Sequence, residues 1–158
     1  MTDTLSLTPL NDWHLEHSAR MVEFAGWSMP IQYGSIVTEH QATRTAVGVF
    51  DVSHMGRLRI EGQDAGRWLD RLSTRRITDL RPGRIRYALI TNQDGGVLDD
   101  VLVYHLETPS ERRYYLLVVN ASNRGKIVDW FQSHLDPAQD VSLRDCTHDT
   151  AMISVQGP

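Results

Sequence analysis

Hydrophobic and polar residues alternate with a period of two along much of the second half of the chain, which predicts β-strands. Two such runs flank residues 92–96, Asn-Gln-Asp-Gly-Gly, whose glycines can adopt the positive φ of a short loop. We therefore predict an antiparallel hairpin over 87–104. Its second arm contains Asp99 and Asp100. Strand alternation points their side chains to opposite faces, so they are not expected to share a site.

A carboxylate among aliphatic neighbours is costly to desolvate unless hydrogen bonds or a positive group compensate it. One of the two aspartates is therefore expected to have a partner. The local sequence leaves an alternative open, in which one aspartate is solvated near the hairpin end and the other binds the turn backbone.

Helical periodicity and capping residues predict four helices. They begin after Thr8, with Pro9 in the first turn; after Ser35, ending near Ala46 with Gly48 as the stop; after Asp64, with Ala65, Trp68, Leu69 and Leu72 facing inward; and after Asn120, with Ile127, Trp130, Phe131 and His134 on one face. Strands are predicted at 20–24, 58–60, 114–119, 141–143 and 151–155, and an aromatic loop at 25–30.

From residue 55 onward the predicted order is strand, helix, three strands, helix, two strands. This order is typical of an α+β domain in which helices cover one face of a largely antiparallel sheet, with a split β-α-β arrangement as the nearest named shape. The length of 158 residues and the 41% hydrophobic content favour one domain, 1–158.

Composition narrows the class of protein. No apolar run approaches a membrane span, and the N-terminus lacks a signal peptide pattern, so a cytoplasmic location without membrane association is expected. The single cysteine, Cys146, excludes internal disulfides and cysteine-cluster metal sites. His14 and His17 have the helical spacing of metal ligands, but without a third ligand an ordinary amphipathic helix is favoured.

The net charge of −4 argues against a general nucleic-acid binder. The charge is uneven, because seven arginines between 67 and 86 face only two aspartates in that stretch. A local charge of about +5 could attract an anionic ligand or an acidic protein. The alternative is that the arginines here reflect a general preference of this chain for arginine over lysine, since it contains fifteen arginines and one lysine.

A series of blocks resembles the amino-terminal part of the T-protein of the glycine cleavage system, a folate-dependent aminomethyltransferase. The blocks run in family order along nearly the whole chain: Thr-Pro-Leu at 8–10, Ala-Arg-Met-Val at 19–22, Phe-Ala-Gly-Trp-x-Met-Pro at 24–30, Ile-Gln-Tyr at 31–33, Glu-His at 39–40, Arg-Thr-Ala-Val-Gly at 44–48, Phe-Asp-Val-Ser-His-Met-Gly at 50–56, Asp-Gly-Gly-Val-Leu-Asp-Asp at 94–100, Val-Val-Asn-Ala at 118–121 and Gln-Gly-Pro at 156–158.

The resemblance implies a three-domain protein more than twice this length, of which this chain looks like the first part. It implies transfer of a one-carbon unit from the aminomethyl-lipoyl arm of the H-protein to tetrahydrofolate, with release of ammonia and without a metal. The family's later Gly-Tyr-Thr-Gly-Glu block is absent, and so are downstream folate-holding residues.

The resemblance also implies the site residues. The family's catalytic aspartate matches Asp100, which leaves Asp99 as a structural residue. Tyr87 and Asn120 match a folate-contacting tyrosine and asparagine; read without the family, they are a packed strand tyrosine and a helix-capping asparagine. His54 and Met55 are expected to line the same cavity, without a catalytic role.

Other readings remain open at this point. Folate-binding domains fused to amine oxidases would carry a Rossmann glycine fingerprint upstream, which this chain lacks. A folate-binding relative that supports iron–sulfur proteins would differ from this chain in the Thr-Pro-Leu block at 8–10 and the Phe-Ala-Gly-Trp-x-Met-Pro block at 24–30. A folate-binding or carrier-docking module without turnover is the alternative from a different class.

Overall fold

The computed structural model describes residues 4–158, and the contacts divide the chain into two compact units. The first unit combines the N-terminal part, up to His54, with His148–Pro158. The second unit is the continuous segment Met55–Thr147. The expectation of one domain stays a prediction, since a compact unit is defined by contacts and not by independent folding.

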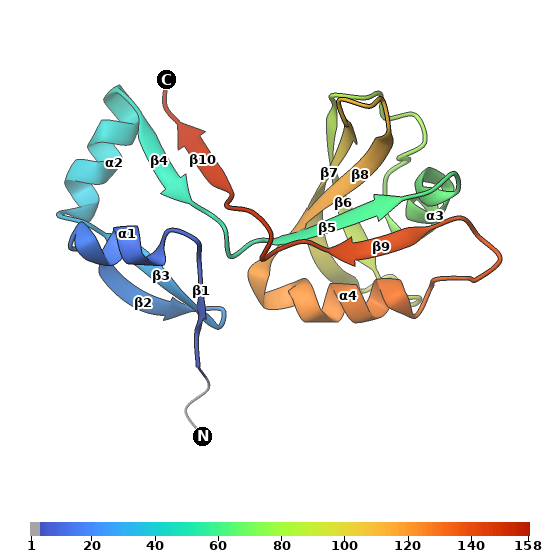
Figure 1. Ribbon diagram of the computed structural model, residues 1–158, viewed down its shortest axis with the longest axis horizontal. Coiled ribbons are helices and arrows are strands. Elements are labelled where there is room, and N and C mark those ends of the chain that lie inside the picture. The colour runs from blue at the N-terminus through green and yellow to red at the C-terminus, as the bar shows by residue number, and fades with distance from the viewer. Residues whose placement is uncertain (1–3) are drawn as a thin grey trace. The chain divides into compact units, whose positions relative to one another are not determined.

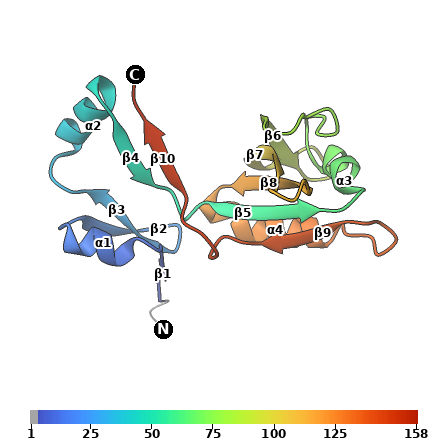
Figure 2. The ribbon, with the colours of Figure 1, turned by 45° about the horizontal axis from the view of Figure 1, so that its top comes forward.

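The second unit is a five-stranded antiparallel sheet with strand order β6-β7-β8-β5-β9 (Figures 1 and 2). Its elements, in chain order, are β5 (Gly56–Glu61), α3 (Ala65–Leu72), β6 (Ile85–Thr91), β7 (Val97–Glu107), β8 (Arg113–Val119), the 3-10 helix η1 (Ala121–Asn123), α4 (Arg124–Gln132) and β9 (Ser142–Asp145).

β8 and β9 are both antiparallel to β5, which lies between them, so they are parallel to each other and connected through α4. This is the split β-α-β arrangement that the sequence predicts, and the α+β class is confirmed.

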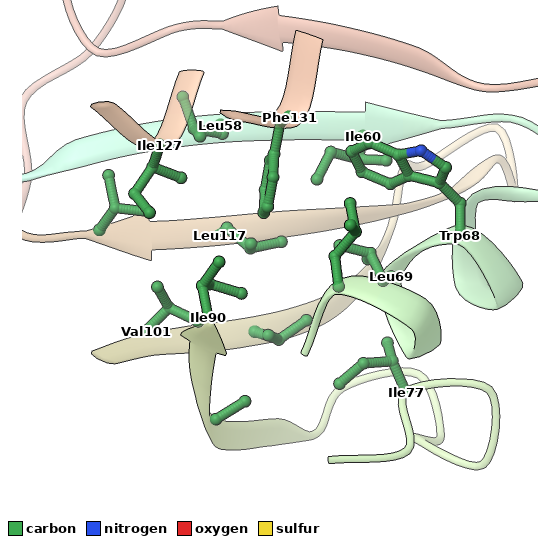
Figure 3. Packing of buried hydrophobic residues seen from close by; sticks show 14 of the residues in the cluster. Leu58, Ile60, Trp68, Leu69, Ile77, Ile90, Val101, Leu117, Ile127 and Phe131 are labelled. Carbon is green, nitrogen blue, oxygen red and sulfur yellow. The ribbon is translucent and has the colours of Figure 1, made fainter. Parts of the chain in front are cut away.

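A single hydrophobic cluster lies between this sheet and its two helices (Figure 3). Trp68 and Leu69 of α3 and Ile127 and Phe131 of α4 are completely buried. The rings of Trp68 and Phe131 meet edge-on at 5.1 Å between centroids, which places both helices on the same face of the sheet. The inward stripe predicted for α3 is confirmed, because its four members are buried.

The predicted hairpin is formed by β6 and β7. Gly95 has φ +80°, and the side-chain oxygen of Asn92 accepts hydrogen bonds from the backbone N–H groups of Asp94 and Gly96. The pairing shifts by one residue between Ile90 and Thr91, a β-bulge. Of the two loop glycines, only Gly95 has a positive φ.

Over its described residues, 4–54 and 148–158, the first unit contains a three-stranded sheet of order β1-β3-β2, two helices and a separate two-stranded pair, β4 with β10. Its elements are β1 (Ser6–Leu7), α1 (Asn11–Glu16), β2 (Arg20–Phe24), β3 (Trp27–Gln32), α2 (Ile36–Thr45), β4 (Gly48–Asp51) and β10 (Ile153–Gln156).

Three local expectations in this unit are wrong. The first helix begins at Asn11, because the Thr8 hydroxyl accepts from the backbone N–H of Leu10 and closes a turn before the helix. The segment expected as an aromatic loop contains β3, since a turn at 25–26 with positive φ returns the chain beside β2. Gly48 does not end a helix but begins β4, where an added Cβ would lie 2.3 Å from the Thr43 hydroxyl.

Candidate functional site

The β6–β7 hairpin positions two of the expected site residues. Tyr87 pairs directly with Leu102, and Asp100 lies two residues before Leu102 on the same strand. Tyr87 and Asp100 are therefore diagonal neighbours on one face of the sheet. This is the face opposite the core, because the alternate β7 residues Val101 and Val103 are buried on the other face, and both site residues are exposed in this chain.

Asn120 joins both aspartates. It follows β8 at the start of η1, and its side-chain amide does not cap the helix. Instead Nδ2 donates to Asp99 Oδ1 at 2.8 Å and to Asp100 Oδ1 at 3.0 Å, with a further contact to the Asp100 carbonyl oxygen at 3.2 Å. The helix-capping reading of Asn120 is thus wrong for its side chain.

Asp99 is the buried carboxylate of the pair, with 3% of its surface exposed. It accepts hydrogen bonds from the Asn120 backbone N–H at 2.9 Å and from Asn123 Nδ2 at 2.6 Å, besides the Asn120 amide. These donors compensate its desolvation without a cation.

The two aspartates point to opposite faces as predicted, and only Asp100 is exposed, but one side chain connects them. Asn120 lies at the end of the neighbouring strand, where its amide reaches the carboxylates of Asp99 and Asp100 at once. Sequence reasoning also missed Asn123; its spacing of three residues from Asn120 after a buried strand was the available signal.

Tyr87 completes the group on the outer face. Desolvation, the negative charge of Asp100 and a hydrogen bond to that carboxylate all raise the pKa of the Tyr87 phenol. The phenol therefore stays protonated at neutral pH, beside the Asp100 carboxylate. Asp100, Asn120 and Asp99 form one continuous set of hydrogen bonds, and Tyr87 lies beside Asp100 on the same face.

His54 and Met55 lie at the point where the chain passes between the units, His54 in the first and Met55 in the second. The imidazole of His54 meets the Phe24 ring edge-on at 5.5 Å. The Met55 carbonyl accepts from Arg57 at 2.8 Å. That these two residues line the cavity of Asp100 stays a prediction.

Residues 10–158 match the family model described as the GCVT N-terminal domain. The chain belongs to this family. An aminomethyltransferase of Desulforamulus reducens is 46% identical over 154 residues, and one of Bacillus subtilis is 43% identical over the same length. Each alignment covers 98% of this chain and 41% of the relative.

A solved structure agrees with the assignment to the GCVT N-terminal domain family. The crystal structure of glycine cleavage system aminomethyltransferase T from Bartonella henselae superposes with a TM-score of 0.83 at 30% identity, over 98% of this chain and 41% of that one. The chain thus spans about two fifths of the length of the relatives it matches.

A second cluster of hydrogen-bonded polar side chains, formed by His14, Tyr33 and Asp51, lies in the first unit. The sequence analysis did not predict that these three residues meet. His14 is 2% exposed; its Nε2 lies 2.9 Å from Asp51 Oδ2 and its Nδ1 lies 2.6 Å from the Tyr33 hydroxyl. Tyr33 and Asp51 also line a cavity of about 500 Å³ between β3, α2 and β4.

His14 and His17 make separate contacts, His14 with Tyr33 and Asp51 and His17 with the Trp13 carbonyl. His17 stacks on Trp13, and among residues 4–158 no group of three or more potential ligands could hold a metal ion. Within the same range no helix is long and apolar enough to cross a membrane.

Proposed function

We propose that this chain supplies the first part of the folate site of a tetrahydrofolate-dependent aminomethyltransferase of the glycine cleavage system. The reaction would move the one-carbon unit from the aminomethyl-lipoyl arm of the H-protein to tetrahydrofolate and release ammonia. Family membership and the names of the relatives support this proposal. Because the chain spans 41% of those relatives, the whole reaction would need residues outside it.

The observation that carries the proposal is the tethered carboxylate of Asp100. It is exposed on the outer face of the sheet, yet the Asn120 amide donates to it and Tyr87 is its diagonal neighbour, so its orientation is constrained before a ligand arrives. A fixed carboxylate can accept a proton from a pterin nitrogen and stabilise positive charge at an iminium-like carbon. No metal is part of this chemistry.

Asn120 would present the other polar contact. Its Nδ2 donates to the two aspartates, so its Oδ1 is the atom that can accept from a ligand. In the proposal Tyr87, His54 and Met55 are folate-binding residues, and a cytoplasmic location remains as expected from the sequence.

The catalytic role of Asp100 is tested by the Asp100→Asn variant of the full-length native protein. The amide keeps the shape but removes the charge and the basicity, so turnover should fall about 10²- to 10⁴-fold at saturating tetrahydrofolate, while folate affinity falls much less. Asp94→Asn, in the exposed hairpin loop, removes a carboxylate that accepts no side-chain or backbone hydrogen bond from residues 4–158 and should leave turnover unchanged.

Turnover that persists in Asp100→Asn would refute the catalytic assignment. Tetrahydrofolate binding by the native protein without any transfer would instead identify a folate-binding module, or a relative that supports iron–sulfur proteins.

The arginine-rich surface is the proposed contact for the H-protein. Arg67, Arg71, Arg75, Arg76, Arg81 and Arg84 are exposed. The two acids of this stretch are engaged locally: Asp70 accepts from residues 77 and 78, and Asp79 pairs with Arg86. Two acids cannot cancel the charge of seven arginines, so the stretch keeps a net positive charge.

Changing Arg75, Arg76 and Arg81 to glutamine should weaken association with an acidic carrier, most strongly at low salt. The same changes at Arg20, Arg44 and Arg112, which lie on other elements, control for net charge. Equal carrier association in both triple variants, measured by surface plasmon resonance across a salt series, would show that the arginines reflect composition alone.

A further inference from the structure

The buried carboxylate of Asp99, together with Asp100, controls which atom Asn120 presents outward. A carboxylate can only accept hydrogen bonds, and Asp99 accepts from the Asn120 backbone N–H, the Asn120 amide and the Asn123 amide. The Asn120 side chain must therefore turn its NH₂ group toward Asp99 and Asp100. Its Oδ1 then faces away from both carboxylates and has no hydrogen-bond partner among residues 4–158.

An unconstrained asparagine could turn its amide over and serve as donor or acceptor as the ligand required. Here both hydrogens of Nδ2 are used, one by Asp99 and one by Asp100. The outer face of the site accordingly presents acceptors alone from these two side chains: the Asp100 carboxylate and the Asn120 Oδ1.

We propose that Asp99 is a positioning residue that makes this site selective for the reduced pterin. In tetrahydrofolate the ring nitrogens 5 and 8 carry hydrogens and donate, whereas in folic acid the same nitrogens carry lone pairs and accept. Fixed acceptors in the site can bind the N–H donors of tetrahydrofolate, but they repel the lone pairs of folic acid. This inference rests on the proposed folate-binding function and assigns Asp99 a role beyond stability.

The experiment compares dissociation constants for tetrahydrofolate and folic acid in the native protein, by calorimetry under reducing conditions. The native protein should prefer tetrahydrofolate. In Asp99→Asn an NH₂ group replaces one acceptor oxygen and opposes at least one of the three donors, which weakens the hold on Asn120 that Asp99 shares with Asp100, so the preference should fall about five- to tenfold. A purely structural role would weaken both ligands equally and leave the ratio unchanged, which would overturn the inference.

Asn123→Ser is the matched control. It removes one donor to Asp99 but keeps the carboxylate that orients Asn120, so it should lower the melting temperature and leave the ratio of the two constants intact. A ratio that falls as far in Asn123→Ser as in Asp99→Asn would also overturn the inference, because loss of stability would then explain it.

A measurement on the native protein covers the case in which Asp99→Asn does not fold. The Asn120 side-chain NH₂ should exchange with solvent markedly more slowly than that of Gln93, which is exposed in the hairpin loop. Equal exchange rates would refute the fixed orientation without any ligand. If the amide is protected but the native protein binds neither pterin, the proposed function fails and the selectivity fails with it, while the orientation stands.

Discussion

At the scale of single residues, several buried polar groups in this chain are satisfied by neighbours that are distant in sequence. Asp51 is an example from the first unit. Burial by itself raises the pKa of its carboxyl, but hydrogen bonds from His14, Ser53 and Thr8 outweigh this effect and hold the pKa below its ordinary value of 3.8. The ionised form is thus the one that the fold stabilises.

We predict that Asp51 links the stability of the first unit to pH. A carboxyl with a lowered folded pKa stabilises the protein above its unfolded pKa, and this contribution is lost as the pH falls below about 4 through the folded pKa. Asp51→Asn should cost about 2 kcal/mol at pH 7 and less at pH 3, measured as urea unfolding free energies.

Glu16→Gln, an exposed carboxylate of α1, is the control and should change stability little at either pH. An equal loss at pH 7 and pH 3 for Asp51→Asn would show that the charge of Asp51 is not what the hydrogen bonds stabilise.

At the scale of elements, turns decide where strands pair. The β6–β7 loop needs a left-handed residue at Gly95, whose φ is +80°, although no atom lies within 4 Å of an added Cβ there. Gly125 in α4 also has open space around an added Cβ, but its φ is not positive. An alanine at either position would meet no steric clash, but only at Gly95 would it strain the backbone.

Gly95→Ala should therefore destabilise the protein by about 1 kcal/mol, and Gly125→Ala should stabilise it by up to about 1 kcal/mol, because alanine reduces the entropy of the unfolded helix segment. Thermal unfolding of both variants gives the comparison. If Gly125→Ala lowered the melting temperature, the helix propensity of residue 125 would not be what limits the stability of α4.

At the scale of the whole molecule, apolar burial is uneven between the two compact units. Every member of the main hydrophobic cluster lies between Leu58 and Phe131, inside the second unit. The first unit carries most of the exposed large apolar side chains, including Ile36, Val49 and Phe50, and α2 has no buried residue.

We predict that the segment 55–147 folds when expressed alone, with a cooperative urea transition, because its sheet and core are complete without the other residues. The segment 4–54 alone should show none, since β4 loses its partner β10 and a short isolated hairpin or strand is not stable in water. A gradual, non-cooperative loss of structure in 55–147 would contradict this prediction.

The sequence by itself determined the α+β class, the β6–β7 hairpin, the inward stripe of α3 and the opposite faces of Asp99 and Asp100. These features follow from periodicity and turn chemistry within short windows. The family blocks pointed further, to Asp100, Tyr87 and Asn120, whose roles stay predictions.

Only the tertiary structure decided which aspartate is buried, that Asn120 joins the two, and that His14, Tyr33 and Asp51 meet. Asp99 and Asn120 are 21 residues apart and His14 and Asp51 are 37 apart. Their contacts depend on strand order and on where each strand ends, and a local pattern of residues contains neither.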